Sequence, residues 1–154
     1  MISSGGISKG KYGFIPEIFH TNNINILFER IAINPGRPMV FGVTDGVCCF
    51  GMLGTPVSAF IMFELLTKPL LFSMMGHDFK PVIVRMELDK TIKRKNTEKD
   101  SWLPARFTEN SKVTSLKYHG SGYTNALCQA DGLLYIPAIA TEISKGTIVD
   151  IRLI

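Results

Sequence analysis

The chain has 154 residues, a formal net charge of +4 and 45% apolar residues. This apolar share excludes a disordered chain, and the length allows one domain or two small ones. The mild positive charge suits a small phosphate-bearing ligand. A nucleic-acid partner would need a basic stripe with exposed aromatics. The densest basic run, residues 90–99, is interrupted by Glu98 and polar residues. We therefore interpret it as a solvated turn and expect no nucleic-acid partner.

The chain carries no signal for secretion, because its first residues are polar and rich in glycine. The longest apolar stretch, residues 57–75, contains Glu64, Lys68 and Pro69. These interruptions argue against a membrane span. We therefore expect a cytoplasmic protein with no membrane partner.

The cysteines and methionines favour packing over metal binding. Cys48 and Cys49 are adjacent in a predicted strand, so their side chains point to opposite faces and cannot converge on one metal. With Cys128 they are expected to be buried, reduced thiols. Met62, Met74 and Met75 are expected to pack within a helix. No metal site is predicted from these residues.

Strand and helix signals alternate in the first half of the chain. The predicted elements are the end of a strand at 1–4, a helix at 12–21, a strand at 24–33, a hairpin at 39–43 and 47–50, and a helix from 56 that Pro69 bends or interrupts and Gly76 ends. Asp45-Gly46 is a strong hairpin turn signal. Pro56 suits a first helical position, and the Thr55 hydroxyl is expected to cap that helix.

From residue 80 the pattern changes to short strands separated by polar turns. The predicted strands are 82–88, 102–107, 113–118, 133–136 and 148–153, with a helical turn at 125–130. The change places a domain boundary within residues 77–81. The sequence therefore predicts a partial α/β domain at residues 1–78 and a small all-β domain at residues 79–154.

Three turns are candidates for ligand binding. They are Ser4-Gly5-Gly6-Ile7-Ser8-Lys9-Gly10, Pro35-Gly36-Arg37-Pro38 and Gly51-Met52-Leu53-Gly54-Thr55-Pro56-Val57-Ser58. Glycines let backbone N–H groups approach a ligand, and a helix N-terminus adds partial positive charge. The two glycine-rich turns and an arginine held between prolines together predict a pocket for a phosphorylated or oxyanionic ligand.

Each candidate also has a plain structural reading. A single glycine-rich turn is more often only a strand-to-helix connection, and Arg37 could be a solvated turn residue. Ser8 and Ser58 could cap helices instead of donating to a phosphate. No catalytic residue is predicted, since His20, His77 and His119 lie far apart without an acidic partner beside a nucleophile. The predicted substrate-binding residues are Gly5, Gly6, Ser8, Gly10, Pro35, Gly36, Arg37, Pro38, Gly54, Thr55, Pro56 and Ser58.

These motifs resemble the C-terminal part of the molybdopterin molybdenumtransferases, the MoeA family, which is related to the gephyrin E domain. The family carries a Gly-Gly-x-Ser-x-Gly turn, a Pro-Gly-Lys-Pro turn and a Leu-Pro-Gly-Asn-Pro-Val-Ser helix start. Here Arg37 replaces the lysine, Leu53 replaces the proline and Thr55 replaces the asparagine. Gly120-Ser121-Gly122 and Gln129-Ala130-Asp131-Gly132 extend the resemblance into the tail.

The resemblance implies a role in molybdenum cofactor biosynthesis. Family members insert molybdate into adenylylated molybdopterin and release AMP, helped by Mg²⁺. The three turns would line a pterin-phosphate pocket in the C-terminal half of a three-layer, MogA-like α/β domain, and a small barrel-like β domain would follow. A homodimer and a MogA-type adenylyltransferase are the implied protein partners.

The sequence departs from the family in two ways. Family members place an aspartate soon after the first turn, whereas Lys11 and Gly13 stand here, and glycine offers no carboxylate for Mg²⁺ or molybdate. The family's N-terminal domains and the first half of its α/β domain have no counterpart in these residues. We therefore expect the chain alone to be inactive. The alternative is a non-catalytic molybdopterin-binding or scaffold module.

Overall fold

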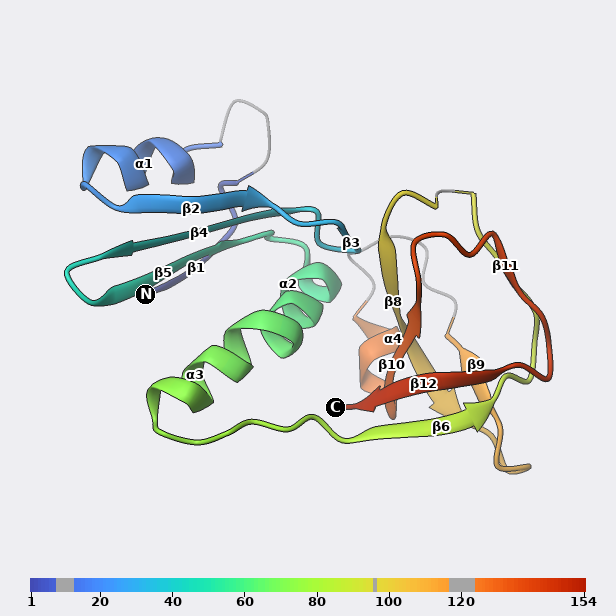
Figure 1. Ribbon diagram of the computed structural model, residues 1–154. Coiled ribbons are helices and arrows are strands. Elements are labelled where there is room, and N and C mark those ends of the chain that lie inside the picture. Colours follow the sequence, from blue (N-terminus) through green and yellow to red (C-terminus); the bar gives the residue numbers. More distant parts are fainter. Residues whose placement is uncertain (8–12, 96, 117–123) are drawn as a thin grey trace.

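The computed structural model describes residues 1–7, 13–95, 97–116 and 124–154, and it contains two main sheets (Figure 1). The first sheet has the order β1-β5-β4-β2. Its strands are β1 (Ile2–Ser4), β2 (Asn25–Arg30), β4 (Pro38–Thr44) and β5 (Val47–Met52). β1 is parallel to β5, while the pairs β4–β5 and β2–β4 are antiparallel.

Helices cover both faces of the first sheet (Figure 1). On one face lies α1 (Ile15–Thr21), whose buried Phe19 packs with Val40. On the other lies a long helix made of α2 (Pro56–Met62), a π-helical turn η1 (Phe63–Thr67) and α3 (Lys68–Met74). Val57 and Ile61 of α2 pack there with Met39. Met39 and Val40 are neighbours in β4 and serve opposite faces, as the alternation of a strand requires.

The predicted hairpin is confirmed. Thr44 pairs with Val47, and the two residues between them, Asp45 and Gly46, have φ of 41° and 78°. Positive φ at both central residues defines the type I′ turn that Asp-Gly favours.

The strand expected at 24–33 is divided between the two sheets. The Ile31 N–H donates to the Arg37 carbonyl at 3.1 Å, so the chain turns away from the first sheet after β2. The next two residues form β3 (Ile33–Asn34), which pairs in parallel with β8 (Asp100–Phe107). Hydropathy alternation cannot show this transfer, because the alternation within one segment does not indicate which sheet the segment joins.

The second sheet has the order β3-β8-β10-β12-β6, and β9 pairs with β8. Its remaining strands are β6 (Ile83–Glu87), β9 (Val113–Ser115), β10 (Gly132–Ile136) and β12 (Ile148–Leu153). A bridge between Leu88 and Val113 brings the chain that follows β6 up to β9. The side chains enclosed by these strands form a separate core of Leu88, Ala105, Val113, Leu134, Ile136, Val149 and Ile151.

Residues 90–99, expected to form a solvated turn, are more ordered than predicted. β7 (Ile92–Lys93) pairs with β11 (Glu142–Ile143). Arg94 donates to the carbonyls of Pro137, Ala140 and Lys99 at 2.6, 3.4 and 2.5 Å. One arginine thus ties three segments together, which a charge count along the sequence does not reveal. The expected helical turn is confirmed as α4 (Asn125–Cys128). Of the three cysteines expected to be buried, Cys49 is buried, whereas Cys128 at the end of α4 is exposed, so that expectation was wrong there.

The long helix continues through the interruptions expected from the sequence. Pro69 lies in the first turn of α3, and the disturbance takes the form of η1, where the Lys68 N–H donates to the Phe63 carbonyl. By length and composition alone the 19-residue helix Pro56–Met74 could cross a membrane, although its interruptions in the sequence argued against a span. This is weak evidence, because core helices of soluble proteins pass the same test, and 33% of this one is buried against the protein.

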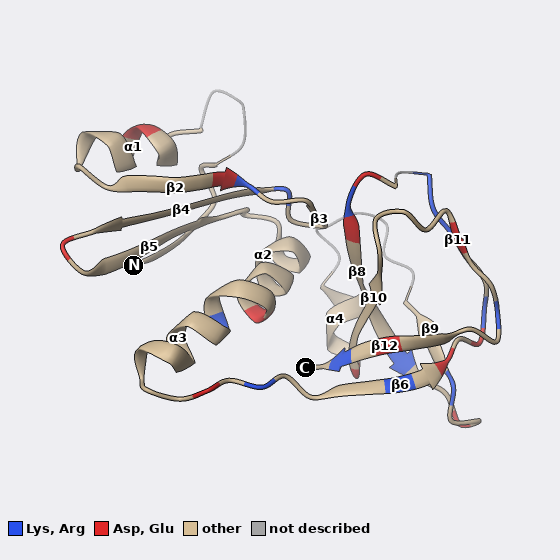
Figure 2. Cartoon of the chain, viewed as in Figure 1, with Lys and Arg blue, Asp and Glu red and all other residues tan. Residues whose placement is uncertain are grey.

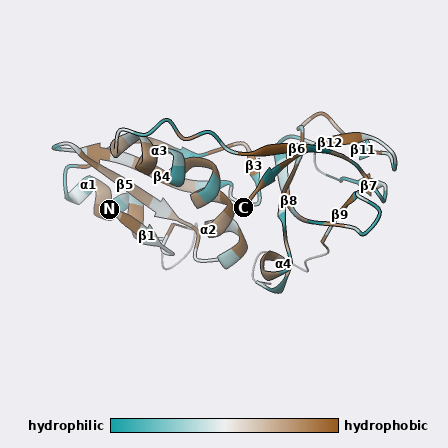
Figure 3. Cartoon of the chain, turned by 90° about the horizontal axis from the view of Figure 1, so that it is seen from below, coloured by the Kyte–Doolittle hydropathy of each residue, from teal (hydrophilic) through white to brown (hydrophobic). Residues whose placement is uncertain are grey.

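The result is a mixed α/β structure, mostly sheet, with charge gathered at one end. Figure 2 shows few charged residues on the first sheet and its helices and many around the second sheet. Figure 3, a view from below, shows the two sheets side by side along an elongated molecule. Hydrophobic colour marks both α2 and the strands β6 and β12 in that view.

Replacing Gly36 by alanine is expected to lower the free energy of unfolding by about 2 kcal/mol or more. Gly36 has φ +128°, and a Cβ there would lie 2.6 Å from Cε of Met62. The variant therefore combines backbone strain with overpacking of α2. Urea denaturation measures the change.

The matched control is Gly46→Asn. Gly46 has φ +78° with open space around its Cβ position, and asparagine tolerates that backbone. Its stability should change by less than about 0.5 kcal/mol. Equal effects of the two variants would contradict the packing of Gly36 on Met62.

Candidate functional site

The three predicted turns lie at one edge of the first sheet. Ser4 of β1 pairs with Met52 of β5, and because the strands are parallel both end at this edge. β4 is antiparallel to β5, with Val40 opposite Gly51, so β4 begins where β5 ends. Ligands of open α/β sheets commonly bind beyond the carboxyl ends of parallel strands. We name this place the loop edge; it comprises residues 5–6, 35–38 and 53–55.

The first and third turns touch one another. A Cβ on Gly54 would lie 3.3 Å from Cα of Gly5, so a side chain at position 54 would crowd the first turn. Gly5 N–H donates to the Met52 carbonyl at 2.8 Å, and Ser4 Oγ donates to the Leu53 carbonyl at 3.3 Å. At Gly5 and Gly54 the two backbones thus approach one another with no side chain between them.

The second turn is built largely for packing. The Asn34–Pro35 peptide bond is cis, and Pro35 and Gly36 are buried, with Gly36 against Met62. Arg37 follows and is exposed. Its backbone is fixed by its carbonyl bond to Ile31 and by the next residue, Pro38, at the start of β4. The turn therefore presents one cation at the loop edge.

The third turn leads into the long helix but is not capped as predicted. Thr55 has the extended backbone of an N-cap and Pro56 follows as expected, yet the Thr55 side chain makes no capping bond. Its Oγ1 is buried and has no hydrogen-bond partner among the described residues. Ser58 is buried within the first turn of α2. A threonine before a predicted helix does not determine which way its hydroxyl points. At this helix start the Thr55 carbonyl accepts from the Ala59 N–H at 3.0 Å.

The structure brings some predicted site residues together and separates others. Gly5, Gly6, Gly54 and Thr55 gather where β1 and β5 end, with Pro56 exposed beside them. Arg37 and Pro38 belong to the neighbouring turn. Pro35, Gly36 and Ser58 are buried in packing contacts. Ser8 and Gly10 lie outside the described residues, as does Ser121.

The loop edge offers donors rather than acids or bases. The backbone N–H groups at a helix N-terminus and an exposed guanidinium suit an oxyanion. Within the described part of the chain, no three His, Cys, Asp or Glu side chains gather as a metal site. The arrangement therefore offers hydrogen-bond donors and a positive charge of the kind that an oxyanion needs, and the described residues place no general base beside them.

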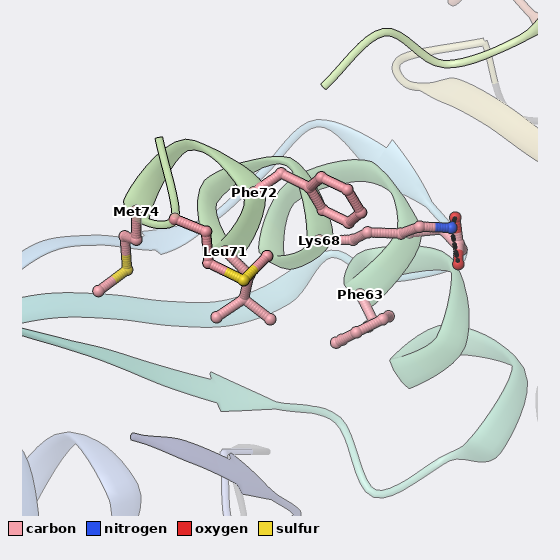
Figure 4. A pocket seen from close by; sticks show the side chains of 7 residues that line it. Phe63, Lys68, Leu71, Phe72 and Met74 are labelled. Atoms are coloured by element: carbon pink, nitrogen blue, oxygen red, sulfur yellow. Dashed lines mark hydrogen bonds and ion pairs between the residues drawn. The ribbon is translucent and has the colours of Figure 1, made fainter. Parts of the chain in front are cut away.

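A second surface feature was missed by sequence reasoning. An apolar pocket of about 490 Å³ lies along η1 and α3, lined by Phe63, Glu64, Lys68, Leu71, Phe72, Met74 and Met75. Figure 4 shows the labelled side chains projecting from this one helix. Met62 packs in the core as expected, but Met74 and Met75 are 59% and 62% exposed, so the expectation that they pack was wrong. Helical spacing alone does not distinguish an outward apolar stripe from a buried one.

Comparisons with known proteins agree with the motif resemblance. A family model described as the MoeA C-terminal region (domain IV) matches residues 87–154. The chain is 29% identical over 157 aligned residues to a molybdopterin molybdenumtransferase of Staphylococcus aureus (strain Mu50), covering 99% of this chain and 37% of that protein. A Staphylococcus epidermidis protein of the same name is 28% identical over 163 aligned residues. The chain thus spans about 37% of the length of these curated relatives.

Solved structures of related name are similar to this chain. A molybdopterin biosynthesis MoeA protein from Pyrococcus horikoshii superimposes with a TM-score of 0.81 and 26% identity, covering 99% of this chain and 36% of that one. A molybdenum cofactor biosynthesis protein from Pyrococcus furiosus gives a TM-score of 0.72 and 27% identity, covering 85% and 46%. The chain is therefore similar along its length to part of the molybdopterin molybdenumtransferases, and its residues 87–154 match the model of the MoeA C-terminal region.

Proposed function

We propose that the loop edge binds the phosphate-bearing part of a molybdopterin substrate, as part of a molybdopterin molybdenumtransferase. The observation that carries this proposal is the contact of Gly5 with Gly54 at the ends of the parallel strands β1 and β5. It brings two glycine-rich turns and the N-terminus of a 19-residue helix to one place.

The physical basis is electrostatic. The aligned peptide dipoles of a long helix leave about half a positive charge at its N-terminus. Gly54 and Gly5 carry no side chains to keep an oxyanion away from the backbone N–H groups. Arg37 adds a full positive charge from the adjacent turn, and its planar guanidinium matches two oxygens of a phosphate.

The reaction we propose is insertion of molybdate into adenylylated molybdopterin with release of AMP. The loop edge would hold the phosphate and orient the pterin, so that molybdate meets the dithiolene in a fixed geometry; positioning of this kind is its contribution. Mg²⁺, which the resemblance implies, finds no carboxylate cluster among the described residues. We assign no step to it.

The domain organisation is part of the same proposal. We infer that residues 1–78 are the C-terminal half of a three-layer, MogA-like domain and that residues 79–154 are a separate barrel-like domain. The two helical layers on the first sheet and the bridge between Leu88 and Val113 support these assignments. A homodimer and contact with a MogA-type adenylyltransferase follow from the family resemblance. A cytoplasmic location without membrane or nucleic-acid partners is inferred from the sequence composition.

One observation favours a second candidate, a binding or scaffold module without turnover. Gly13 stands where family members carry an aspartate, just before α1. Without that carboxylate the loop edge could still bind a phosphate, since binding uses backbone donors and Arg37. Turnover and binding are therefore separable by experiment.

Arg37→Ala is expected to weaken binding of AMP about tenfold, because hydrogen bonds to charged groups contribute about 1.5–3 kcal/mol. Titration calorimetry of the full chain with AMP, and separately with inorganic phosphate, measures the change. Gly54→Val should weaken binding at least as much, since its side chain would fill the contact with Gly5.

Arg85→Ala is the control for the loss of a positive charge. Arg85 is exposed on the second sheet and paired with Asp150 at 3.4 Å. Its removal should leave the AMP affinity within about twofold. Equal weakening by Arg85→Ala and Arg37→Ala would show general charge attraction and count against a site at the loop edge.

Gly13→Asp separates the two candidate functions. The substitution is tested in a protein that joins this chain to the N-terminal region of a longer relative. Molybdenum insertion that appears or rises at least tenfold supports the transferase, because a carboxylate can hold a metal or position molybdate. Unchanged molybdopterin binding with no molybdenum insertion supports the binding module. No molybdopterin binding by the joined protein, with or without the substitution, contradicts both candidate functions.

A further inference from the structure

One backbone carbonyl of the long helix is left without a helical partner. In an α-helix the Glu64 carbonyl would accept from the Lys68 N–H, but that N–H donates to Phe63 in the π-turn η1. The π-type partner of Glu64 would be residue 69, which is proline and has no N–H. The Glu64 carbonyl therefore needs a donor from elsewhere, because Glu64 is only 6% exposed.

Pro69 explains why the helix adopts this register. A proline removes one helical donor and its ring clashes with the carbonyl four residues earlier, here that of Leu65. In the wider π-turn the Lys68 N–H reaches back to Phe63, and the Glu64 carbonyl faces the missing N–H of Pro69.

The donor is Arg152 of β12. Its Nη2 donates to the Glu64 carbonyl and lies 4.0 Å from the Glu64 carboxylate. That carboxylate is also held by Lys68 Nζ at 2.9 and 3.0 Å, the contact drawn in Figure 4. Phe79, from the connection between α3 and β6, has its ring centroid 5.5 Å from both cations. Each cation is within the range of a cation–π contact.

Arg152 is only 6% exposed, so its charge depends on these partners. Burial lowers the pKa of Arg152 and the Glu64 carboxylate opposes that shift. A buried pair contributes little net stability compared with apolar packing, but loss of one partner is costly because the other is left uncompensated. Breaking the contact of Arg152 with Glu64 would therefore leave a buried charge without its partner.

No strand of the first sheet pairs with a strand of the second among the described residues. The chain between β2 and β4 reaches the second sheet through β3, which pairs with β8 over two residue pairs. Apolar contact is made by Leu133, with Trp102 and Leu127 beside it, on the core under the long helix. The connection from Met75 to Val82 has no regular structure and contains Gly76 with φ +79°.

We propose that Arg152 and the Glu64 carbonyl form a latch that holds the second sheet in one orientation against the long helix. Opening the latch lets the two sheets move as units about the Met75–Val82 connection and the short β3–β8 pairing. This inference does not depend on the proposed substrate. It links Glu64 and Pro69 of the long helix to Arg152 of β12, which is far from them in the sequence.

A double-mutant cycle tests the latch. Arg152→Met is expected to raise hydrogen-exchange rates of the β12 amides about a hundredfold, the cost of breaking a buried pair. Pro69→Ala supplies an N–H that can reach the Glu64 carbonyl, so Arg152→Met in that background should raise the rates only about tenfold. The same fold-change in both backgrounds would overturn the latch.

Two further variants keep the test decisive. Arg152→Lys retains a buried cation that can still donate to the Glu64 carbonyl, so this variant should fold. It should raise the hydrogen-exchange rates of the β12 amides about tenfold, and by less in the Pro69→Ala background. Arg85→Met, on the exposed pair with Asp150, should change exchange less than about threefold. An Arg85→Met effect as large as that of Arg152→Lys would also overturn the proposal.

Small-angle scattering tests the movement itself. The Arg152 variants should show a larger radius of gyration than the unaltered chain, and Arg85→Met should not. Faster exchange in β12 with an unchanged radius of gyration would mean that Arg152 only stabilises the second sheet, and the movement of the sheets as units would be rejected.

Discussion

The parallel pairing of β1 with β5 is the constraint on which the candidate site depends. Parallel strands end at the same edge of a sheet, so the turns that follow them must meet. Here they meet at backbone contact distance, because glycine occupies positions 5 and 54. The antiparallel β4 begins at the same edge and brings Arg37. A pairing shifted by one residue would separate the groups of the proposed oxyanion site.

The long helix connects that edge to the rest of the molecule. Its N-terminus lies at the third turn, its middle covers the sheet through Val57 and Ile61, and its π-turn meets Arg152 of the second sheet. One element therefore supplies positive potential to the site, part of the core and the polar contact between sheets. Its outer face is apolar and exposed at Met74 and Met75.

Local signals in the sequence predicted much of the fold. Asp45-Gly46 specified its turn, and the apolar alternation located β6, β8, β10 and β12, because these features depend only on neighbouring residues. The transfer of β3 to the second sheet and the β7–β11 pair depend on contacts between distant segments. Alternation within a single strand carries no information about them.

The same distinction holds for the site. The order of three turns indicated the loop edge, and the structure places Gly5, Gly6, Gly54 and Thr55 together there. It could not indicate that Pro35, Gly36 and Ser58 are buried, since tertiary packing decides that. Nor could a hydroxyl at Thr55 reveal that its Oγ1 makes no cap. The role of Arg152 was invisible because its partner is a carbonyl freed by Pro69.

The most direct test of the central claim is a titration of the ¹⁵N-labelled chain with AMP, followed by amide chemical shifts. The account predicts that the largest saturable shifts occur at Gly5, Gly6, Arg37, Gly54 and Thr55, while amides around Leu71 and Met75 stay unchanged. Saturable shifts confined to the apolar pocket on α3, or spread over the basic second sheet, would contradict an oxyanion site at the ends of β1 and β5.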